Sequence, residues 1–278
     1  MKLRSLALGS LVLAAAGSLL WLGARRHRDR FQYHTSGSDA QLASVLTGSS
    51  YERREVMTAP GVTLQLIVRR APSDSDPFLV LFPGNAERQL SPSLPIVESL
   101  RANHAAGAAV VSYRGFEGST GTPSPRAAAH DARAVLDYLH RELGISGKRL
   151  ILIGYSMGSG IALRIAAELA QRGQEPMALV MLSPFWRLEL GPAGWLGPLL
   201  PSEFYTVEEV IPYLRSRAVI VGGAQDGALP VAKHARPLVA ALGARARYVE
   251  LQGAGHADYL QDRSVMDRIA RLLWEEGE

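Results

Sequence analysis

Short apolar runs alternate with helical patterns from residue 62 to residue 274, and this alternation restricts the fold more than any other feature of the chain. Most of the runs are as long as β-strands, and the segments between them carry apolar residues at helical spacing. Strands are predicted at 62–68, 77–82, 108–113, 149–153, 177–182, 219–221 and 246–251, and helices at 127–143, 157–171, 231–242 and 265–274. Because nearly continuous apolar strands need cover on both faces, we expect one doubly wound α/β domain with a mostly parallel sheet.

Residues 185–215 interrupt this alternation between two predicted strands. The segment combines several Gly and Pro residues with the aromatic residues Phe185, Trp186, Trp195, Phe204 and Tyr205. One interpretation is a loop with a short helix that completes the core. The other is a small cap-like insert that lines an apolar substrate pocket.

The most informative motif is Gly-x-Ser-x-Gly at residues 154–158, between a predicted strand and a predicted helix. In that setting the serine occupies a strained turn, which exposes its hydroxyl at the carboxyl edge of the sheet. Glycine is needed at 154 and 158 because a side chain at either position would crowd the turn. The motif therefore predicts Ser156 as a nucleophile.

A serine hydroxyl is a weak nucleophile and needs a base, and His256 is in the right setting for one. It follows the last predicted strand, whereas the other six histidines lack this setting and no two have metal-ligand spacing. Asp226 follows the strand at 219–221 and is predicted to orient the imidazole, in the chain order Ser156, Asp226, His256. Asp258 is the competing carboxylate, although its position favours a cap on the last helix.

The developing oxyanion in such a reaction needs preorganised amide donors. Met157 begins the helix after the nucleophile, so its N–H is one predicted donor. The second is predicted to be Asn85, in the loop Pro83–Ala86 that follows the strand at 77–82. Gly84 in this loop permits a close approach of the backbone.

At these residues the chain resembles the alpha/beta-hydrolase superfamily, specifically the membrane-anchored serine hydrolases of the bud-emergence-homologue and acyl-protein-thioesterase-like group. The matching stretches are Pro83–Ala86, Tyr113–Ser124, Gly154–Gly158, Asp226 and Gly253–His256. The resemblance implies the alpha/beta-hydrolase fold and hydrolysis of an ester or thioester bond in a small-molecule or acylated substrate. No cofactor or metal is expected.

Two residues depart from the pattern of that group. Pro83 stands where the group usually has His, and Glu117 stands where it usually has Gly. Both lie beside the groups that shape the oxyanion loop, so we expect them to affect rate or substrate choice without removing a catalytic atom. Arg114 and Ser119, in the same loop as Glu117, are predicted to hold that loop beneath the site.

The same residues are compatible with two alternative functions. The triad chemistry also cleaves amides, which makes a serine peptidase the second candidate. A catalytically inactive binding protein on the same fold is the third, because a fold alone does not guarantee activity. The chain has no cysteine, which excludes a thiolate nucleophile and an iron–sulfur cluster.

The first 30 residues have the composition of a membrane anchor. Ser5–Ala24 is a stretch of 20 uncharged residues between basic flanks, long enough to span a bilayer as a helix. A cleaved signal segment is the alternative, and the side of the membrane stays open. We therefore predict an anchor or signal at 1–30, a linker at 31–53 and a hydrolase domain at 54–278.

The net charge follows the same division. The whole chain carries +4, but residues 1–30 hold six basic residues against one acidic residue. The remaining 248 residues have 24 basic and 25 acidic residues, a net charge of −1. The basic character therefore indicates a membrane-associated segment and no nucleic-acid partner.

Overall fold

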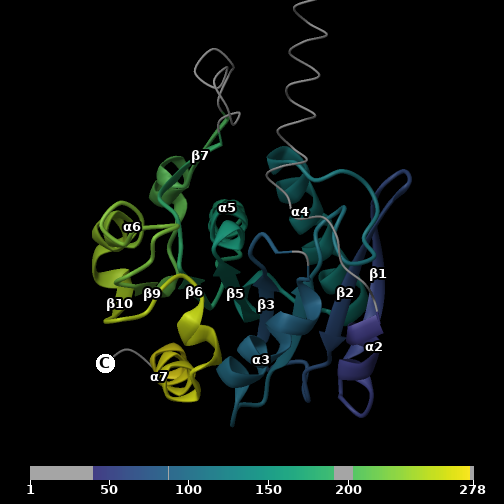
Figure 1. Ribbon diagram of the computed structural model, residues 1–278. Helices are drawn as coiled ribbons and strands as arrows, with labels where there is room; N and C mark the ends of the chain where they lie inside the picture. The colour runs from purple at the N-terminus through teal and green to yellow at the C-terminus, as the bar shows by residue number, and fades with distance from the viewer. Residues whose placement is uncertain (1–39, 87, 191–202, 276–278) are drawn as a thin grey trace, which may run out of the picture.

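The computed structural model describes residues 40–86, 88–190 and 203–275, and its centre is an eight-stranded sheet (Figure 1). The strands are β1 (Glu52–Ala59), β2 (Val62–Arg69), β3 (Phe78–Phe82), β4 (Gly107–Val111), β5 (Leu150–Tyr155), β6 (Ala178–Leu182), β9 (Arg217–Gly223) and β10 (Ala246–Leu251). Their order across the sheet is β1-β2-β4-β3-β5-β6-β9-β10. Strand β2 is antiparallel to both β1 and β4, and all other neighbours are parallel.

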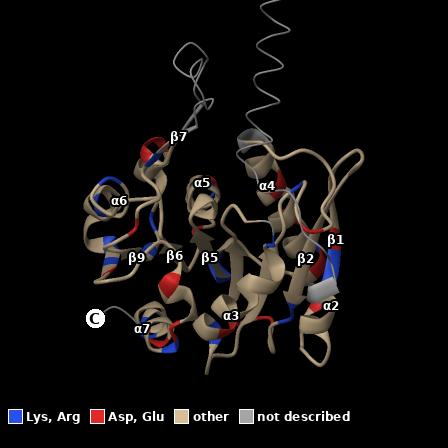
Figure 2. Ribbon diagram, in the orientation of Figure 1, with Lys and Arg blue, Asp and Glu red and all other residues tan. Residues whose placement is uncertain are grey.

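The central strands carry no charge, and this explains their position. Strands β3, β4 and β6 are buried at every residue and contain only apolar residues and glycine. Figure 2 shows charged residues mainly on the helices, the loops and the outer strands. Burying these strands removes a large apolar area from water, which is the main force that stabilises the fold.

Helices cover both faces of the sheet (Figure 1). One face packs against α4 (Pro125–Leu143), α5 (Met157–Gln171) and α6 (Ala235–Leu242), and the other against α2 (Ala40–Leu46), α3 (Leu90–Arg101) and α7 (Arg263–Trp274). Short 3₁₀ turns are η1 (Gly147–Arg149), η3 (Glu208–Tyr213), η4 (Gly243–Arg245) and η5 (Asp258–Gln261). The predicted doubly wound α/β fold is confirmed.

Local signals set the ends of two helices. The Ser124 side chain accepts a hydrogen bond of 3.2 Å from Ala127 N–H at the start of α4. Gly144 ends that helix in the left-handed conformation, with φ of 64°. The carboxylate that caps α7 is Asp262, which accepts from the N–H groups of Ser264 and Val265, so the cap expected at Asp258 lies four residues later.

Helices α2 and α3 and strand β1 lie where the sequence predicts no helix or strand. Helix α3 contains Pro92 and Pro95, which obscure its helical pattern, yet it buries Leu94, Val97 and Leu100 against the sheet. Helix α2 lies inside the predicted linker 31–53 and buries Leu42, and strand β1 begins at Glu52. Residue 53, the predicted domain boundary, lies inside β1, and α2 packs against α3.

The interrupting segment 185–215 contains a hairpin of β7 (Arg187–Leu190) and β8 (Glu203–Thr206), followed by η3. Phe185, Val207, Val210 and Leu214 are buried in the core. These described parts of the segment complete the core. Residues 191–202, with Trp195, lie outside the described residues.

Residues 1–39 also lie outside the described residues, and with them the predicted anchor Ser5–Ala24. Among residues 40–86, 88–190 and 203–275, no helix has the length and apolar character needed to cross a bilayer.

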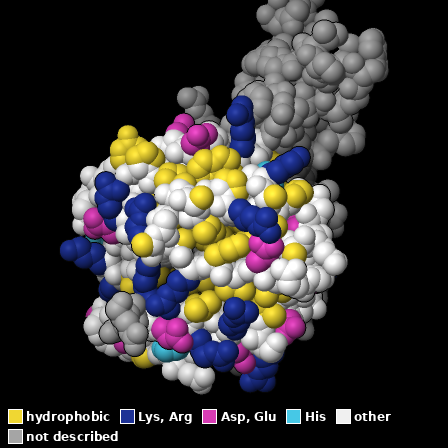
Figure 3. All heavy atoms as spheres, turned by 90° about the vertical axis from the view of Figure 1, so that its left-hand side faces the viewer, with side chains coloured by type: hydrophobic (Ala, Val, Ile, Leu, Met, Phe, Trp, Pro, Cys, Tyr) yellow, Lys and Arg dark blue, Asp and Glu magenta, His cyan; other side chains and the backbone are white. Residues whose placement is uncertain are grey.

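Figure 3 shows the face that carries α6, β10 and α7, where Lys and Arg side chains lie among hydrophobic patches and acidic side chains. Arg236 of α6 pairs with Glu250 of β10 at 2.7 Å, and Arg247 of β10 pairs with Glu275 at 3.3 Å. Acidic neighbours therefore partly neutralise the positive charge of this face.

Candidate active site

Ser156 lies in a tight turn between β5 and α5, at the carboxyl edge of the sheet. Its φ of 49° and ψ of −115° are costly for a residue with a side chain. The flanking glycines make this turn sterically feasible, because a Cβ at Gly158 would lie 1.9 Å from the Phe82 carbonyl oxygen. A Cβ at Gly154 would lie 2.4 Å from the Cα of Ser159. The motif thus holds the Ser156 hydroxyl above the edge of the sheet.

His256 connects Ser156 to Asp226. The Nε2 atom of His256 is 2.9 Å from the Ser156 Oγ, and its Nδ1 is 2.7 Å from Asp226 Oδ2. The His256 side chain is partly exposed, whereas that of Asp226 is almost completely buried. The three side chains predicted from the sequence are therefore brought together in one hydrogen-bonded line.

The Asp226 carboxylate is held by the backbone of its own loop. Its Oδ1 accepts from Ala228 N–H at 2.9 Å and from Leu229 N–H at 2.7 Å, which leaves Oδ2 directed at His256. Asp258, the competing carboxylate, instead accepts from Gly255 N–H at 2.7 Å. Asp258 therefore shapes the loop that carries the histidine, and Asp226 contacts the imidazole.

A buried side chain that no sequence motif indicates, Ser183, holds the His256 backbone, and the buried Tyr259 contacts Ser183. The Ser183 hydroxyl donates to the His256 carbonyl at 2.8 Å and lies 2.9 Å from the Tyr259 hydroxyl. Ser183 directly follows β6 and has a φ of 44°. Its place at the carboxyl end of a predicted strand was the one sequence signal that it lies near the site. Together these groups restrict the position of the imidazole.

Tyr155 packs beside the imidazole, with ring centroids 5.5 Å apart. Burial raises the pKa of Tyr155 to about 12, so the phenol stays neutral at physiological pH. A neutral ring next to His256 shields one side of the imidazole from water without adding a charge.

The loop Pro83–Ala86 follows β3 and passes next to the nucleophile. A Cβ at Gly84 would lie 2.9 Å from the Tyr155 ring and 3.4 Å from the Cβ of Ser156. Met157, the other predicted oxyanion residue, is the first residue of α5. Both predicted donors therefore come from backbone that adjoins Ser156, and their roles stay predictions.

The two departures from the related group have defined contacts. The Pro83 carbonyl accepts a 2.9 Å hydrogen bond from the buried Tyr113 hydroxyl. Glu117 is buried, with a φ of 33°, and its carboxylate binds the start of α3. In the same loop, Arg114 binds Asp131 and Ser119 donates to the Ser112 carbonyl, which agrees with a structural role for both.

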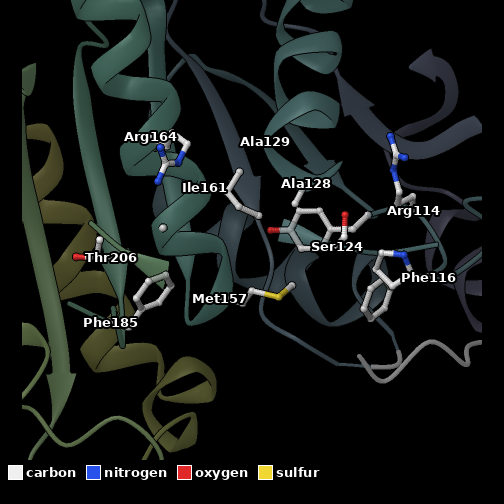
Figure 4. Close-up of a pocket in the computed structure, with 13 residues that line it drawn as sticks. Arg114, Phe116, Ser124, Ala128, Ala129, Met157, Ile161, Arg164, Phe185 and Thr206 are labelled. Carbon is white, nitrogen blue, oxygen red and sulfur yellow. The ribbon is translucent and has the colours of Figure 1, made fainter. Parts of the chain in front are cut away.

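An apolar pocket of about 50 Å³ opens beside Met157 (Figure 4). Met157, Ile161 and Phe185 are among the residues that line it. Arg164, also in the lining, is paired with Glu209 at 2.6 Å. The pocket therefore offers an apolar interior beside Met157, the residue that follows Ser156.

Within the described ranges, no group of three or more His, Asp and Glu residues is arranged to hold a metal ion.

Residues 79–218 match the alpha/beta hydrolase family, and the chain belongs to that family. Protein bem46 of Schizosaccharomyces pombe is 31% identical over 120 residues, which cover 42% of this chain and 40% of that protein. Lysophosphatidylserine lipase ABHD12 of Bos taurus is 32% identical over 123 residues, 44% of this chain and 30% of that protein. The chain thus matches less than half the length of these curated relatives. The resemblance to the alpha/beta hydrolases, and to bem46 among them, is confirmed.

Solved structures share the fold at low sequence identity. An alpha-beta hydrolase from Vibrio vulnificus superposes with a TM-score of 0.66 at 20% identity and covers 84% of both chains. The Pyrococcus furiosus esterase Pf2001 superposes with a TM-score of 0.64 at 18% identity, over 80% of this chain and 90% of that one. These superpositions show that the chain shares the fold of these proteins.

Proposed function

We propose that this chain is a serine hydrolase that cleaves carboxylic ester or thioester bonds. The observation that carries the proposal is the hydrogen-bonded line from Ser156 Oγ to His256 Nε2 and from His256 Nδ1 to Asp226 Oδ2. This arrangement supplies a nucleophile, a base within reach of its proton, and a carboxylate that orients the base.

In the first half of the proposed reaction, Ser156 Oγ attacks the acyl carbonyl carbon while its proton passes to His256 Nε2. The carbonyl oxygen becomes an oxyanion, which the Asn85 and Met157 amides stabilise. The bond to the leaving alkoxide or thiolate then breaks, and His256 returns the proton to that group. The acyl group remains as an ester on Ser156.

In the second half, water attacks the acyl-enzyme and gives a proton to His256. The second tetrahedral intermediate collapses, the bond to Ser156 breaks, and His256 returns the proton to the serine oxygen. Asp226 stays ionised throughout and stabilises the imidazolium, because its Oδ2 accepts from Nδ1. Atoms and protons balance without a further reactant.

The apolar pocket supports an acyl substrate. Because Met157, Ile161 and Phe185 present carbon and sulfur to its interior, an aliphatic acyl chain would lose less hydration free energy there than a charged peptide side chain (Figure 4). Two proteins similar to this chain are named a lysophosphatidylserine lipase and an esterase. Both descriptions fit hydrolysis of a carboxylic ester.

A fluorophosphonate probe tests the proposal, because it reacts with an activated serine. We expect the wild-type protein to be labelled and Ser156→Ala to remain unlabelled. Ser264→Ala is the matched control, since Ser264 lies in the cap of α7 and its hydroxyl contacts Asp262. Equal labelling of the wild type and Ser156→Ala would sink the assignment.

The two alternative functions give different results in a substrate panel. A peptidase would cleave the amide matched to the ester with readily measurable, Ser156-dependent turnover. An inactive binding protein would turn over neither substrate while remaining folded. We expect Ser156-dependent cleavage of the ester and thioester and slow cleavage of the matched amide.

We further propose that residues 1–30 attach the hydrolase domain, residues 54–278, to a membrane. The uncharged stretch Ser5–Ala24 with its basic flanks supports this. The full chain should sediment with membranes and resist alkaline carbonate extraction. Intact mass of the isolated protein separates an anchor, which retains Met1, from a cleaved signal.

A further inference from the structure

A buried glutamine outside the triad bridges two loops at the site. Gln89 is 1% exposed and immediately precedes α3. Its Oε1 accepts from Tyr113 N–H at 2.9 Å, and its Nε2 donates to the Gly84 carbonyl at 3.2 Å. A backbone N–H only donates and a carbonyl only accepts, so both contacts agree on the orientation of the side-chain amide.

Glu117 holds Gln89 in place from the other side. Its Oε2 accepts from Gln89 N–H and from Leu90 N–H, both at 2.6 Å. The carboxylate lies at the positive end of α3, where a negative charge is favourable. Glu117 is itself 2% exposed and keeps a φ of 33°, a conformation that favours glycine. The costly backbone conformation of Glu117 is thus coupled to the position of Gln89.

The contact between Gln89 and Gly84 sets the direction of the next amide. In a trans peptide the carbonyl and the following N–H point in opposite directions, and the described chain has no cis peptide. The Gly84 carbonyl and the Asn85 N–H belong to the same peptide plane. Because Gln89 holds the carbonyl, the Asn85 N–H must point away from Gln89.

This peptide adjoins the nucleophile, since a Cβ on Gly84 would lie 3.4 Å from the Ser156 Cβ. We propose that Gln89, anchored by Glu117, is a positioning residue that aims the Asn85 N–H at the oxyanion of the reaction. The inference rests on the proposed function, and it gives a role to the glutamate that this chain carries at a backbone position favouring glycine.

The test compares Gln89→Leu, which removes both contacts, with Gln89→Glu, which keeps the acceptor for Tyr113 and removes the donor to Gly84. Loss of an oxyanion donor typically lowers kcat by about 10²–10³-fold. We expect a misaimed donor to lower kcat by roughly 10–100-fold in both variants, with KM changed less than about twofold. Affinity for an alkyl boronic acid, which forms a tetrahedral adduct on Ser156, should fall by a similar factor.

Glu117 gives a rescue experiment. Glu117→Gln keeps an oxygen for the two N–H groups and should retain most of the wild-type kcat. Glu117→Gly relieves the backbone but removes the acceptor, and its kcat should fall with that of the Gln89 variants. A purely structural role for Glu117 would lower the melting temperature of both variants without changing the ratio of boronic acid affinity to KM.

Ser216→Ala is the matched control. Ser216 is buried at the opposite edge of the sheet, where its hydroxyl donates a 2.6 Å hydrogen bond to the Pro176 carbonyl. It should lower the melting temperature and leave kcat unchanged. Folded Gln89→Glu with wild-type kcat and boronic acid affinity would overturn the inference. Absence of Ser156-dependent turnover in the wild type would instead overturn the proposed function, and the inference with it.

Discussion

The Ser183 hydroxyl donates a 2.8 Å hydrogen bond to the carbonyl oxygen of His256. This contact connects the end of β6 to the loop after β10, and it holds the backbone of the histidine independently of Asp226. The imidazole is therefore positioned from two sides, through its ring by Asp226 and through its main chain by Ser183.

Ser183→Ala should lower both stability and activity. The His256 carbonyl and the Tyr259 hydroxyl would lose a buried partner, which costs about 1–3 kcal/mol. We expect kcat to fall by several-fold, because the histidine loop gains freedom while the triad atoms remain. Urea unfolding and ester hydrolysis measure the two effects. A stable variant with unchanged kcat would show that Asp226 alone positions His256.

Asp226→Asn should abolish most activity while preserving the fold. The N–H groups of Ala228 and Leu229 require an oxygen at the Oδ1 position, so the new amide NH₂ must face His256 Nδ1. Nδ1 then becomes an acceptor, Nε2 carries the proton, and the imidazole cannot take a proton from Ser156. We expect kcat to fall by about 10⁴-fold. Circular dichroism should show a native spectrum, and a loss below tenfold would contradict this role.

Gly158→Ala should prevent correct folding of the nucleophile turn. Its methyl group would lie 1.9 Å from a backbone oxygen, and no side-chain rotation can relieve that contact. The expected loss is at least about 3 kcal/mol of the free energy of unfolding. Gly227→Ala is the control, because a Cβ there meets no atom within 4 Å. Similar unfolding midpoints for both variants would contradict the steric role of Gly158.

Stability should decrease in mild acid partly through His234. Burial lowers the pKa of His234, and its Nδ1 accepts from Trp186 N–H at 3.3 Å, which requires an unprotonated atom. The unfolded chain binds the proton more tightly, so stability falls as pH drops through the ordinary value of 6.5 toward the lowered native pKa.

His234→Asn tests this relation, because its side-chain oxygen accepts from Trp186 N–H without titrating. The melting temperature of the wild type should decrease more between pH 7.5 and pH 5.5 than that of the variant. NMR titration of the His234 ring gives its native pKa directly. Parallel melting curves over this range would rule out the contribution of His234.

The pocket beside Met157 predicts acyl-chain selectivity. Each buried methylene contributes roughly 0.8 kcal/mol, or about fourfold in kcat/KM. Ile161→Phe fills part of the pocket and should shift preference toward acetyl esters, whereas Phe185→Ala should extend the accepted chain length. A series of p-nitrophenyl esters measures the shift. An unchanged profile in both variants would place the acyl group elsewhere.

Much of the fold follows from the sequence because its central strands β3, β4, β5 and β6 carry no charged residue and its motifs are local. The edge position of Ser156, Asp226 and His256 was predictable, since each follows a recognisable strand. Their catalytic roles stay predictions. Helix α3 was not predictable, because Pro92 and Pro95 oppose a helix locally and burial against the sheet overrides them.

The supporting contacts of the site could not be predicted for a different reason. Gln89 and Gly84 are close in sequence, but Glu117 joins them only through the folded position of α3. Likewise, Ser183 and Tyr259 are 76 residues apart. Such pairs depend on the packing of several elements, so no sequence motif with a fixed spacing predicts them.

The backbone of Ser156, with φ of 49° and ψ of −115°, adopts a conformation that glycine reaches more easily than serine. The chain therefore gives up folding free energy at the residue proposed to carry the chemistry. Selection for stability alone would favour glycine at this position, because glycine adopts these angles at lower cost and leaves the pocket and the surrounding loops unchanged. Ser156→Gly would thus remove the proposed nucleophile and at the same time relieve this backbone strain.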